Sequence, residues 1–231
     1  MKTIGLIGGM SWESTAEYYR IINEAVKERL GGLHSAKIVM YSFDFADIGD
    51  LQRQGKWDEA TNLMIEAAKR VESGSADFVL ICTNTMHKMA DDVAVNINIP
   101  LLHIVDVTAE RIIPVGFKKV GLLGSAFTME EDFYKGRLKE KYALDVLIPN
   151  EADRQVVHNV IFKELCLGEI KDSSREQIKA IMKGLVDDGA RGIILGCTEL
   201  PLLVKQEDCP VPLFDTTAIH AKAAVDYALK D

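Results

Sequence analysis

The sequence predicts an α/β fold built from two similar domains, each with a parallel four-stranded sheet. Short apolar runs rich in branched residues alternate with longer segments of helical spacing, which is typical of parallel strands joined by helical crossovers. Several runs show no polar alternation, as expected for strands covered on both faces. The chain has 231 residues, which is enough for two small domains.

Apolar runs and helical segments follow one another along the chain. The expected strands are Ile4–Ile7, Ile38–Phe43, Phe78–Cys82, Leu101–Val105, Val120–Leu123, Val146–Ile148 and Gly192–Leu195. The expected helices are Ser14–Leu30, Ala60–Val71, Phe127–Tyr142, Asp153–Leu167, Ser174–Val186 and Thr217–Leu229. The first helix carries apolar residues at helical spacing and stops at Gly31-Gly32, a common C-terminal signal.

Three pairs of segments recur in the same order and favour a duplicated α/β half over chance likeness between apolar strands. The pairs are IGLIGG (4–9) with VGLLGS (120–125), ADFVLICTNT (76–85) with ARGIILGCTE (190–199), and PLLHIVDVTA (100–109) with PVPLFDTTA (210–218). We therefore expect two halves related by a pseudo-two-fold axis, with a ligand site in the cleft between them. The third pair suggests that the chain crosses back, so residues 1–100 and 214–231 would form the first domain and residues 101–213 the second.

Composition excludes several functional classes. The net charge of −8 disfavours nucleic-acid binding, which needs a basic surface. No run of about 18 apolar residues predicts a membrane span, and the opening MKTIGLIGGM suits a strand better than a signal peptide, so a cytoplasmic protein is expected. None of the four cysteines forms a CxxC pair or lies at zinc-ligand spacing from a histidine, so we expect free thiols and no metal site.

The second repeated pair of segments identifies candidate catalytic residues. Ligands of open α/β sheets bind at the carboxyl ends of strands, and here the alignment sets Thr83 opposite Cys197 and Asn84 opposite Thr198. Successive strand residues point to opposite faces, so Cys82 is expected to pack while Thr83 faces the site. Two opposed groups suit removal of a proton from one face of a carbon and its return to the other. Cys197 would serve as the base if nearby N–H groups or a following helix N-terminus stabilised its thiolate; a cysteine that merely packs is the alternative.

Other polar residues near the strand ends could hold a ligand. The glycines of GLIGGM do not form GxGxxG, but a tight turn there would bring Met10 and Ser11 to the cleft. Gln52 and Arg53 could bind a carboxylate, although a solvated loop explains them equally well. Lys171, beside a glycine turn, could supply another cation or simply lie on the surface. No Ser-His-Asp pattern and no GxSxG elbow favours a hydrolase.

The segments IGLIGGMSWEST, CTNTMHK and GCTEL resemble the glycine turn and the two strand-end motifs of the aspartate/glutamate racemase family. The resemblance implies a cofactor-independent enzyme that binds an amino acid between two α/β domains, with two cysteines as opposed acid and base. The family's second cysteine, within GCTE, maps onto Cys197. Its first cysteine, directly before an Asn-Thr pair, maps onto Thr83, which is a departure from the family pattern.

The resemblance thus implies an aspartate or glutamate racemase with Cys197 as base and Thr83 as the opposed proton donor. Asn84, Thr85 and Thr198 would hold the α-carboxylate or the developing charge, with Glu199 also in the substrate-binding set. An aliphatic hydroxyl is a far weaker acid than a thiol, so Thr83 would need a water or a neighbouring group to relay a proton. A broad-specificity racemase, a decarboxylase or isomerase of small dicarboxylates, and a non-catalytic small-molecule binding module stay open as alternatives. A homodimer is a further possibility.

Overall fold

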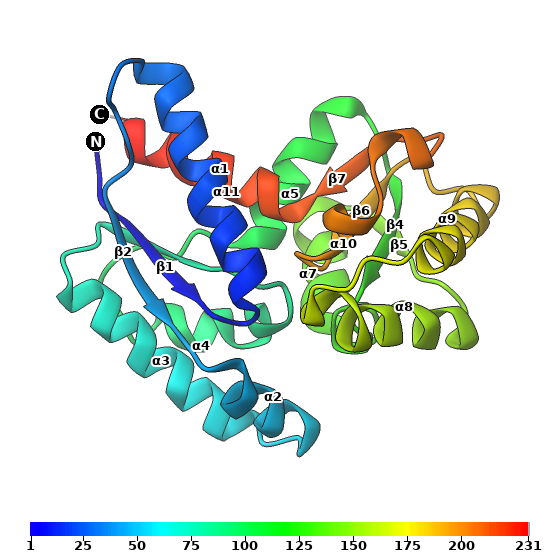
Figure 1. The fold of residues 1–231 in the computed structure, drawn as a ribbon, viewed down its shortest axis with the longest axis horizontal. Helices are drawn as coiled ribbons and strands as arrows, with labels where there is room; N and C mark the ends of the chain where they lie inside the picture. The colour runs from blue at the N-terminus through cyan, green and yellow to red at the C-terminus, as the bar shows by residue number, and fades with distance from the viewer. Residues whose placement is uncertain (231) are drawn as a thin grey trace. The chain divides into compact units, whose positions relative to one another are not determined.

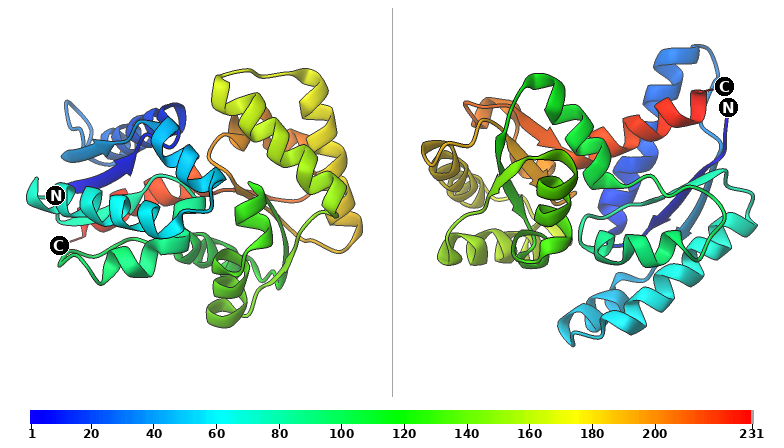
Figure 2. Two further views of the ribbon diagram at one scale, coloured as in Figure 1. Left: turned by 90° about the horizontal axis from the view of Figure 1, so that it is seen from below. Right: turned by 180° about the vertical axis from the view of Figure 1, so that it is seen from behind.

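The computed structural model describes residues 1–230 and divides the chain into two compact units. Unit 1 comprises Met1–Ile104 together with the chain from His220 onward, and unit 2 comprises Val105–Ile219. The chain therefore leaves unit 1 after Ile104 and re-enters it at His220, whereas the sequence placed these crossings after residue 100 and at residue 214. Each unit is an α/β layer structure of its own (Figures 1 and 2).

The sheet of unit 1 has three parallel strands in the order β2-β1-β3. They are β1 (Ile4–Gly8), β2 (Ile38–Ser42) and β3 (Phe78–Ile81). The prediction of a fourth strand over Leu101–Val105 is wrong, because only one bridge forms, between Val79 and Leu101. Helix α5 (Ile104–Ile112) begins within that run. The run Leu101–Val105 is apolar except for His103, and such a short run fits a buried helix end as well as a buried strand, so its pattern alone could not separate the two.

Helices cover both faces of this sheet, and the alternation along β3 shows which residues each layer buries. Phe78, Leu80 and Cys82 pack with α1 (Trp12–Leu30) and α11 (Thr216–Leu229). Val79 and Ile81 belong to the opposite cluster, which includes residues of α2 (Phe45–Arg53), α3 (Trp57–Ser73) and α4 (Ala90–Ala94). Figure 1 shows α1 and α11 together on one side of β1 and α3 on the other.

Unit 2 has a sheet of four parallel strands, the expected number, in the order β5-β4-β6-β7, but its strand β7 was not among the strands expected from the sequence. These are β4 (Lys119–Gly124), β5 (Asp145–Leu147), β6 (Ile193–Gly196) and β7 (Leu213–Asp215). The helices are α5, α6 (Ala126–Glu130), α7 (Asp132–Tyr142), α8 (Glu151–Lys163), α9 (Asp172–Asp187) and α10 (Leu200–Leu203). The helix predicted over Phe127–Tyr142 is two helices, because Glu131 takes an extended conformation between them.

The first three strands of both sheets have the same spatial order, with the first strand in the centre and the third beside it. Strands β1 and β4 each pair with the strand that carries the following motif: β3 leads to CTNT and β6 leads to GCTE. In a parallel sheet these segments emerge at the carboxyl edge, where ligands of α/β proteins bind. Each unit therefore presents one strand-end motif beside one capped turn.

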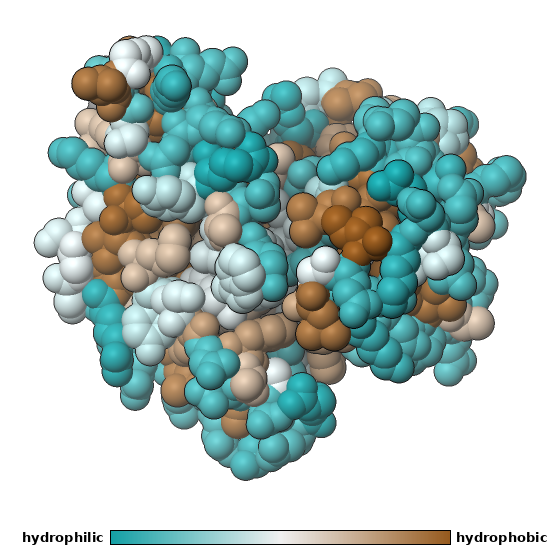
Figure 3. Space-filling model, viewed as in Figure 1, coloured by the Kyte–Doolittle hydropathy of each residue, from teal (hydrophilic) through white to brown (hydrophobic). Residues whose placement is uncertain are grey.

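On the face that Figure 3 shows, the surface of both units is mainly polar, with smaller apolar areas between the polar side chains. Single apolar side chains such as Trp12 and Leu33 are exposed, which is ordinary for a folded chain. Among residues 1–230, no helix combines the length and hydropathy needed to cross a membrane.

Candidate functional site

The turn after β1 is a buried capped loop. Gly9 has φ of 85°, and a Cβ there would lie 2.5 Å from the Phe43 backbone nitrogen, so this position requires glycine. The hydroxyl of Thr15 donates to the Ser11 carbonyl at 2.7 Å and accepts the Gly9 N–H at 2.8 Å. Met10 and Ser11 are both buried, at 4% and 3% exposure. The structure thus places these two predicted residues at the carboxyl end of β1, in a turn fixed by side-chain bonds.

The CTNT motif separates a packing cysteine from a more accessible threonine. Cys82 is completely buried against α1 and α11, and this burial raises the pKa of its thiol. The prediction that Cys82 packs is confirmed. Thr83 follows as a half-buried residue, Asn84 is buried at 2% exposure, and Thr85 begins the 3₁₀ helix η1 (Thr85–Met89).

Helix α2 was not predicted, and it sorts the two neighbouring candidates for carboxylate binding. Gln52 is buried at 6% exposure, and its amide nitrogen lies 3.2 Å from the sulfur of Met86. Gln52 therefore lies against the motif that carries Thr83. The side chain of Arg53 is 70% exposed and forms an ion pair with Asp50. Adjacent residues of a helix point in different directions, so Gln52 is buried while Arg53 lies in solvent.

The GCTE motif of unit 2 forms a compact cluster around one carboxylate oxygen. The thiol of half-buried Cys197 donates to Glu199 Oε2 at 2.9 Å, and the hydroxyl of Thr198 donates to the same oxygen at 3.0 Å. Thr198 and Glu199 are buried, at 4% and 3% exposure. The three consecutive residues therefore share a polar contact next to the end of β6.

The electrostatics of Cys197 differ from the sequence-based expectation. Burial raises the pKa of its thiol well above the ordinary value, and the nearby groups Glu199 and Cys166 raise it further. The expectation that a helix N-terminus would stabilise the thiolate is wrong, because α10 has only four residues and begins three positions later. A nearby N–H group, that of Glu199, does lower the pKa, but burial and the neighbouring groups outweigh it. The thiol faces a carboxylate instead. In this state the proton stays on sulfur.

The turn after β4 matches the turn after β1 and contains residues that the sequence did not nominate. Ser125 caps α6, accepting the Thr128 N–H at 3.3 Å, and the two hydroxyls lie 3.1 Å apart. The Ala126 N–H donates to His158 Nδ1 at 3.2 Å. The alignment of VGLLGS with IGLIGG was the available signal, since it pairs this loop with the one that holds Met10 and Ser11. Ser125 and Thr128 are buried polar residues at the carboxyl end of a central strand.

Lys171, the remaining predicted residue, is engaged with acidic neighbours. It precedes α9, its side chain is 48% exposed, and its ammonium group lies 2.8 Å from Glu169 and 3.4 Å from Glu164. Hydrogen bonding to Glu169 raises its pKa despite the exposure. A substrate carboxylate would have to compete with both glutamates for this cation.

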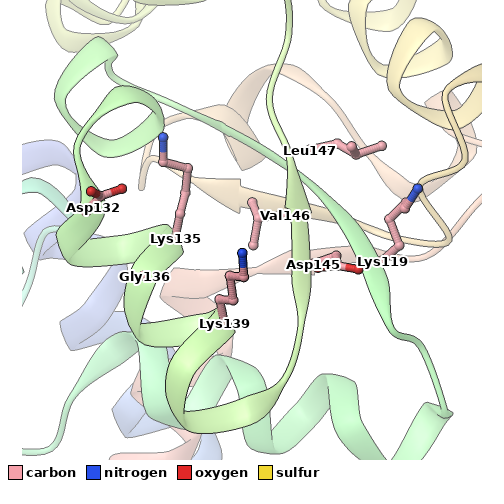
Figure 4. Close-up of a pocket in the computed structure, with 8 residues that line it drawn as sticks. All are labelled: Lys119, Asp132, Lys135, Gly136, Lys139, Asp145, Val146 and Leu147. Carbon is pink, nitrogen blue, oxygen red and sulfur yellow. The ribbon is translucent and has the colours of Figure 1, made fainter.

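A surface pocket of about 360 Å³ lies elsewhere in unit 2 (Figure 4). Lys119 and Asp145 are the first residues of β4 and β5, so the pocket is at the amino ends of these strands. Lys135 and Lys139 of α7 line it together with Asp132. The mixed charges do not select an anion, and the chemistry of the strand-end motifs is at the opposite edge of the sheet. Among residues 1–230, no group of three or more His, Cys, Asp or Glu side chains is arranged to hold a metal ion.

Comparison with known proteins identifies the family of the chain and the origin of its fold. A family model of Asp/Glu/hydantoin racemases matches residues 7–224. The chain belongs to this racemase family. Its curated relatives include the broad-specificity amino-acid racemase RacX of Bacillus subtilis, which is 25% identical over 229 residues and 96% of each chain.

Solved structures of the family have the same fold over the whole chain. A Yersinia pestis protein described as a candidate Asp/Glu racemase is 53% identical, with a TM-score of 0.93 and 100% of both chains covered. An aspartate racemase homologue from Pyrococcus horikoshii is 37% identical, with a TM-score of 0.86 and the same coverage. The aspartate racemase of Picrophilus torridus is 22% identical, with a TM-score of 0.79 over 100% of this chain and 96% of the Picrophilus chain. At this identity the similarity shows the fold alone. The chain is thus a racemase-family enzyme with the family's α/β architecture.

Proposed function

We propose that this racemase acts on aspartate or glutamate without a cofactor, with Cys197 as the base and Thr83 as the opposed proton donor at Cα. The observation that carries the proposal is the pairing of Cys197 with the buried Glu199 carboxylate directly at the end of β6. A thiol bonded to a carboxylate can lose and regain a proton locally. Thr83 occupies the matching position after β3 and offers only a hydroxyl.

The path of the thiol proton gives Glu199 a role different from substrate binding. Cys197 must be a thiolate before it can take a proton from Cα. Because the pKa of its thiol is raised, the proton on sulfur first needs an acceptor. Glu199 Oε2 is that acceptor in our proposal, because it already receives the hydrogen bond from sulfur. A second carboxylate, from the substrate, would be repelled by a charged Glu199 but tolerated once Glu199 carries the proton. We therefore assign Glu199 to proton transfer.

Thr83 cannot act as the mirror image of Cys197. An aliphatic hydroxyl gives a proton only while another donor replaces it, so one direction of the reaction relies on Thr83 as a relay. Enantiomers have equal free energies in water, so kcat/KM must be the same for both directions at equilibrium. The individual kcat and KM values can still differ, and the asymmetry of the two motifs predicts that they do.

The remaining residues provide donors in this proposal. Asn84, Thr85 and Thr198 would hold the α-carboxylate and stabilise negative charge that develops at Cα during proton removal. The amide of Gln52, buried against Met86, would contact the side chain of the substrate. Met10 and Ser11 would form the wall at the capped turn after β1.

A broad-specificity amino-acid racemase is the second candidate, and two observations favour it. Arg53 and Lys171, the cations expected to read a side-chain carboxylate, are paired with acidic residues of the chain. RacX, one of the relatives, is itself described as a broad-specificity racemase. A pocket that reads the side chain through Gln52 alone would accept neutral amino acids as well.

Solvent exchange at Cα tests the proposal. Each enantiomer of aspartate, glutamate and a panel of neutral amino acids is incubated in deuterium oxide, and deuterium at Cα and chirality are followed by mass spectrometry and chiral chromatography. The wild type should exchange and racemise the acidic pair, while Cys197→Ala should lose exchange and the control Cys209→Ala should retain it. Exchange by Cys197→Ala at the wild-type rate would remove Cys197 from the mechanism. Carbon dioxide from malonates, or fumarate from maleate, would instead support the decarboxylase or isomerase alternatives.

Two variants of Thr83 test whether its hydroxyl group or its branched shape is required. Thr83→Ser keeps a hydroxyl, and Thr83→Val keeps the branched shape without it. The proposal expects Thr83→Ser to retain most of kcat and Thr83→Val to lose it by about 100-fold or more, in the range of general acid catalysis. Equal activity of the two variants would show that the hydroxyl of Thr83 transfers no proton.

A further inference from the structure

We infer that His87 is a positioning residue for Thr83 and that it does so as a neutral imidazole with its proton on Nδ1. This inference rests on the proposed role of Thr83. His87 lies four residues after Thr83, within η1, and is buried at 3% exposure. Both of its ring nitrogens contact backbone groups of unit 1.

The two backbone partners determine the tautomer. His87 Nδ1 lies 2.7 Å from the Thr83 carbonyl, which can only accept a hydrogen bond, so Nδ1 carries the proton. His87 Nε2 lies 3.1 Å from the Ile104 backbone nitrogen, which can only donate, so Nε2 carries a lone pair. A peptide group cannot exchange these roles. The ring is therefore a neutral Nδ1–H imidazole bonded at both ends.

The hydrogen bond from His87 to the Thr83 carbonyl lies just beyond the point where the backbone hydrogen bonds between β3 and β1 end. The last link of β3 to β1 is the Cys82 N–H donating to the Ile7 carbonyl at 2.9 Å. One residue later, the imidazole holds the Thr83 carbonyl, and the His87 N–H donates to the Asn84 carbonyl at 3.1 Å. Thr83 is thus held on one side by the sheet and on the other by His87. The imidazole itself is 3% exposed, so little of its ring is open to water.

The bond to Ile104 keeps the ring neutral. Ile104 is the first residue of the nine-residue helix α5, so its N–H is one of the donors that the helix itself leaves without a partner. The positive end of the helix and the inward-pointing N–H oppose a second proton on Nε2. The rings of His103 and His220 face His87 at centroid distances of 4.6 and 5.8 Å, and a charge on either would oppose protonation further.

Two conservative variants divide the functions of the ring. His87→Asn places an amide N–H near the position of Nδ1 and can keep the bond to the Thr83 carbonyl. His87→Gln places an amide oxygen near the position of Nε2 and can keep the bond to Ile104. If positioning of Thr83 is what matters, His87→Asn should retain kcat within a few-fold, while His87→Gln should lose kcat by about 10- to 100-fold with little change in KM, the scale of loss that misplacement of a reacting group by about 1 Å produces. The exposed His34 gives the matched control His34→Asn.

A double variant shows whether His87 acts through Thr83. In the Thr83→Val background, His87→Gln should have no further effect on kcat, because the group being positioned is already absent. Additive losses would overturn the inference, and so would equal kcat in the Asn and Gln single variants, whether both match the wild type or both fall.

A spectroscopic arm decides the tautomer independently of activity. Long-range ¹H–¹⁵N correlation spectra of the wild type, with His87 assigned by its absence in His87→Asn, should show a protonated Nδ1 and an unprotonated Nε2 at neutral pH. A proton on Nε2 would overturn the inference whatever the kinetics. If the wild type exchanges no amino acid at all, the proposed function fails, and this spectrum then decides the geometry of His87 alone.

Discussion

The buried imidazole of His220 should make unit 1 sensitive to mild acid. His220 is completely buried, receives the hydroxyl hydrogen bond of Tyr18 on Nδ1 at 2.9 Å, and contacts the Leu102 carbonyl through Nε2 at 2.8 Å. Burial lowers its pKa from 6.5 to about 4. Because the carbonyl requires the proton on Nε2 and the tyrosine occupies Nδ1, the folded state keeps this ring neutral.

The sign of the effect follows from proton binding. Between pH 6.5 and 4 the unfolded chain protonates this histidine and the folded chain does not, so stability is lost as the pH falls through this window. The full difference corresponds to about 3 kcal/mol, most of which should be lost between about pH 7.5 and 4.5. His220→Gln removes the titrating group, so its stability should fall by that much less over the same interval.

Urea denaturation followed by tryptophan fluorescence measures the free energy of unfolding of unit 1, which contains His220. Both tryptophans of the chain, Trp12 and Trp57, lie in unit 1. Other groups titrate in the same window, and subtraction of the variant from the wild type cancels them. His34→Gln, at an exposed histidine, should have the wild-type pH dependence. Parallel losses of stability in wild type and His220→Gln would refute the reasoning.

Two further predictions concern packing and buried hydroxyls. The Thr217 hydroxyl is buried without a hydrogen bond, whereas that of Thr216 donates to the Leu195 carbonyl at 2.8 Å. In urea titrations Thr217→Val should therefore be neutral or stabilising by about 1 kcal/mol, and Thr216→Val should destabilise by about 1–3 kcal/mol; the reverse order would contradict this. Gly8→Ala should destabilise by about 1–3 kcal/mol because a Cβ there collides with Thr15, while Gly184→Ala, which meets nothing within 4 Å, should raise the melting temperature.

The sequence was informative where a feature depends on local pattern. The glycines after the first apolar strand located the capped loop that holds Met10 and Ser11, and strand alternation identified Cys82 as the packing member of its pair with Thr83. It failed where the outcome depends on distant contacts. The helix that begins within Leu101–Val105 has its first N–H bonded to His87, 17 residues earlier in the chain, and no local pattern records such a contact.

The same limit applies to the candidate site. Gln52 and Arg53 look alike as carboxylate ligands in the sequence, and only the packing of α2 against η1 distinguishes them. The pKa of Cys197 depends on where the Glu199 side chain points, a choice between rotamers that spacing does not encode. The identity of the motif was therefore predictable from the sequence, and its electrostatics were not.

The split of unit 1 between the two ends of the chain sets an order for synthesis. Unit 2 is one continuous stretch, Val105–Ile219, and all of it leaves the ribosome before unit 1 can be completed. Until α11 emerges, the face of the first sheet that includes Ile4 and Phe78 lacks the cover of Ala221, Ala224 and Val225. A nascent chain that has formed this sheet therefore covers the face with α1 but not yet with α11, and such a partly uncovered apolar surface is the kind that chaperones recognise. The second-made domain of this racemase is complete while the first-made one still waits for its last helix.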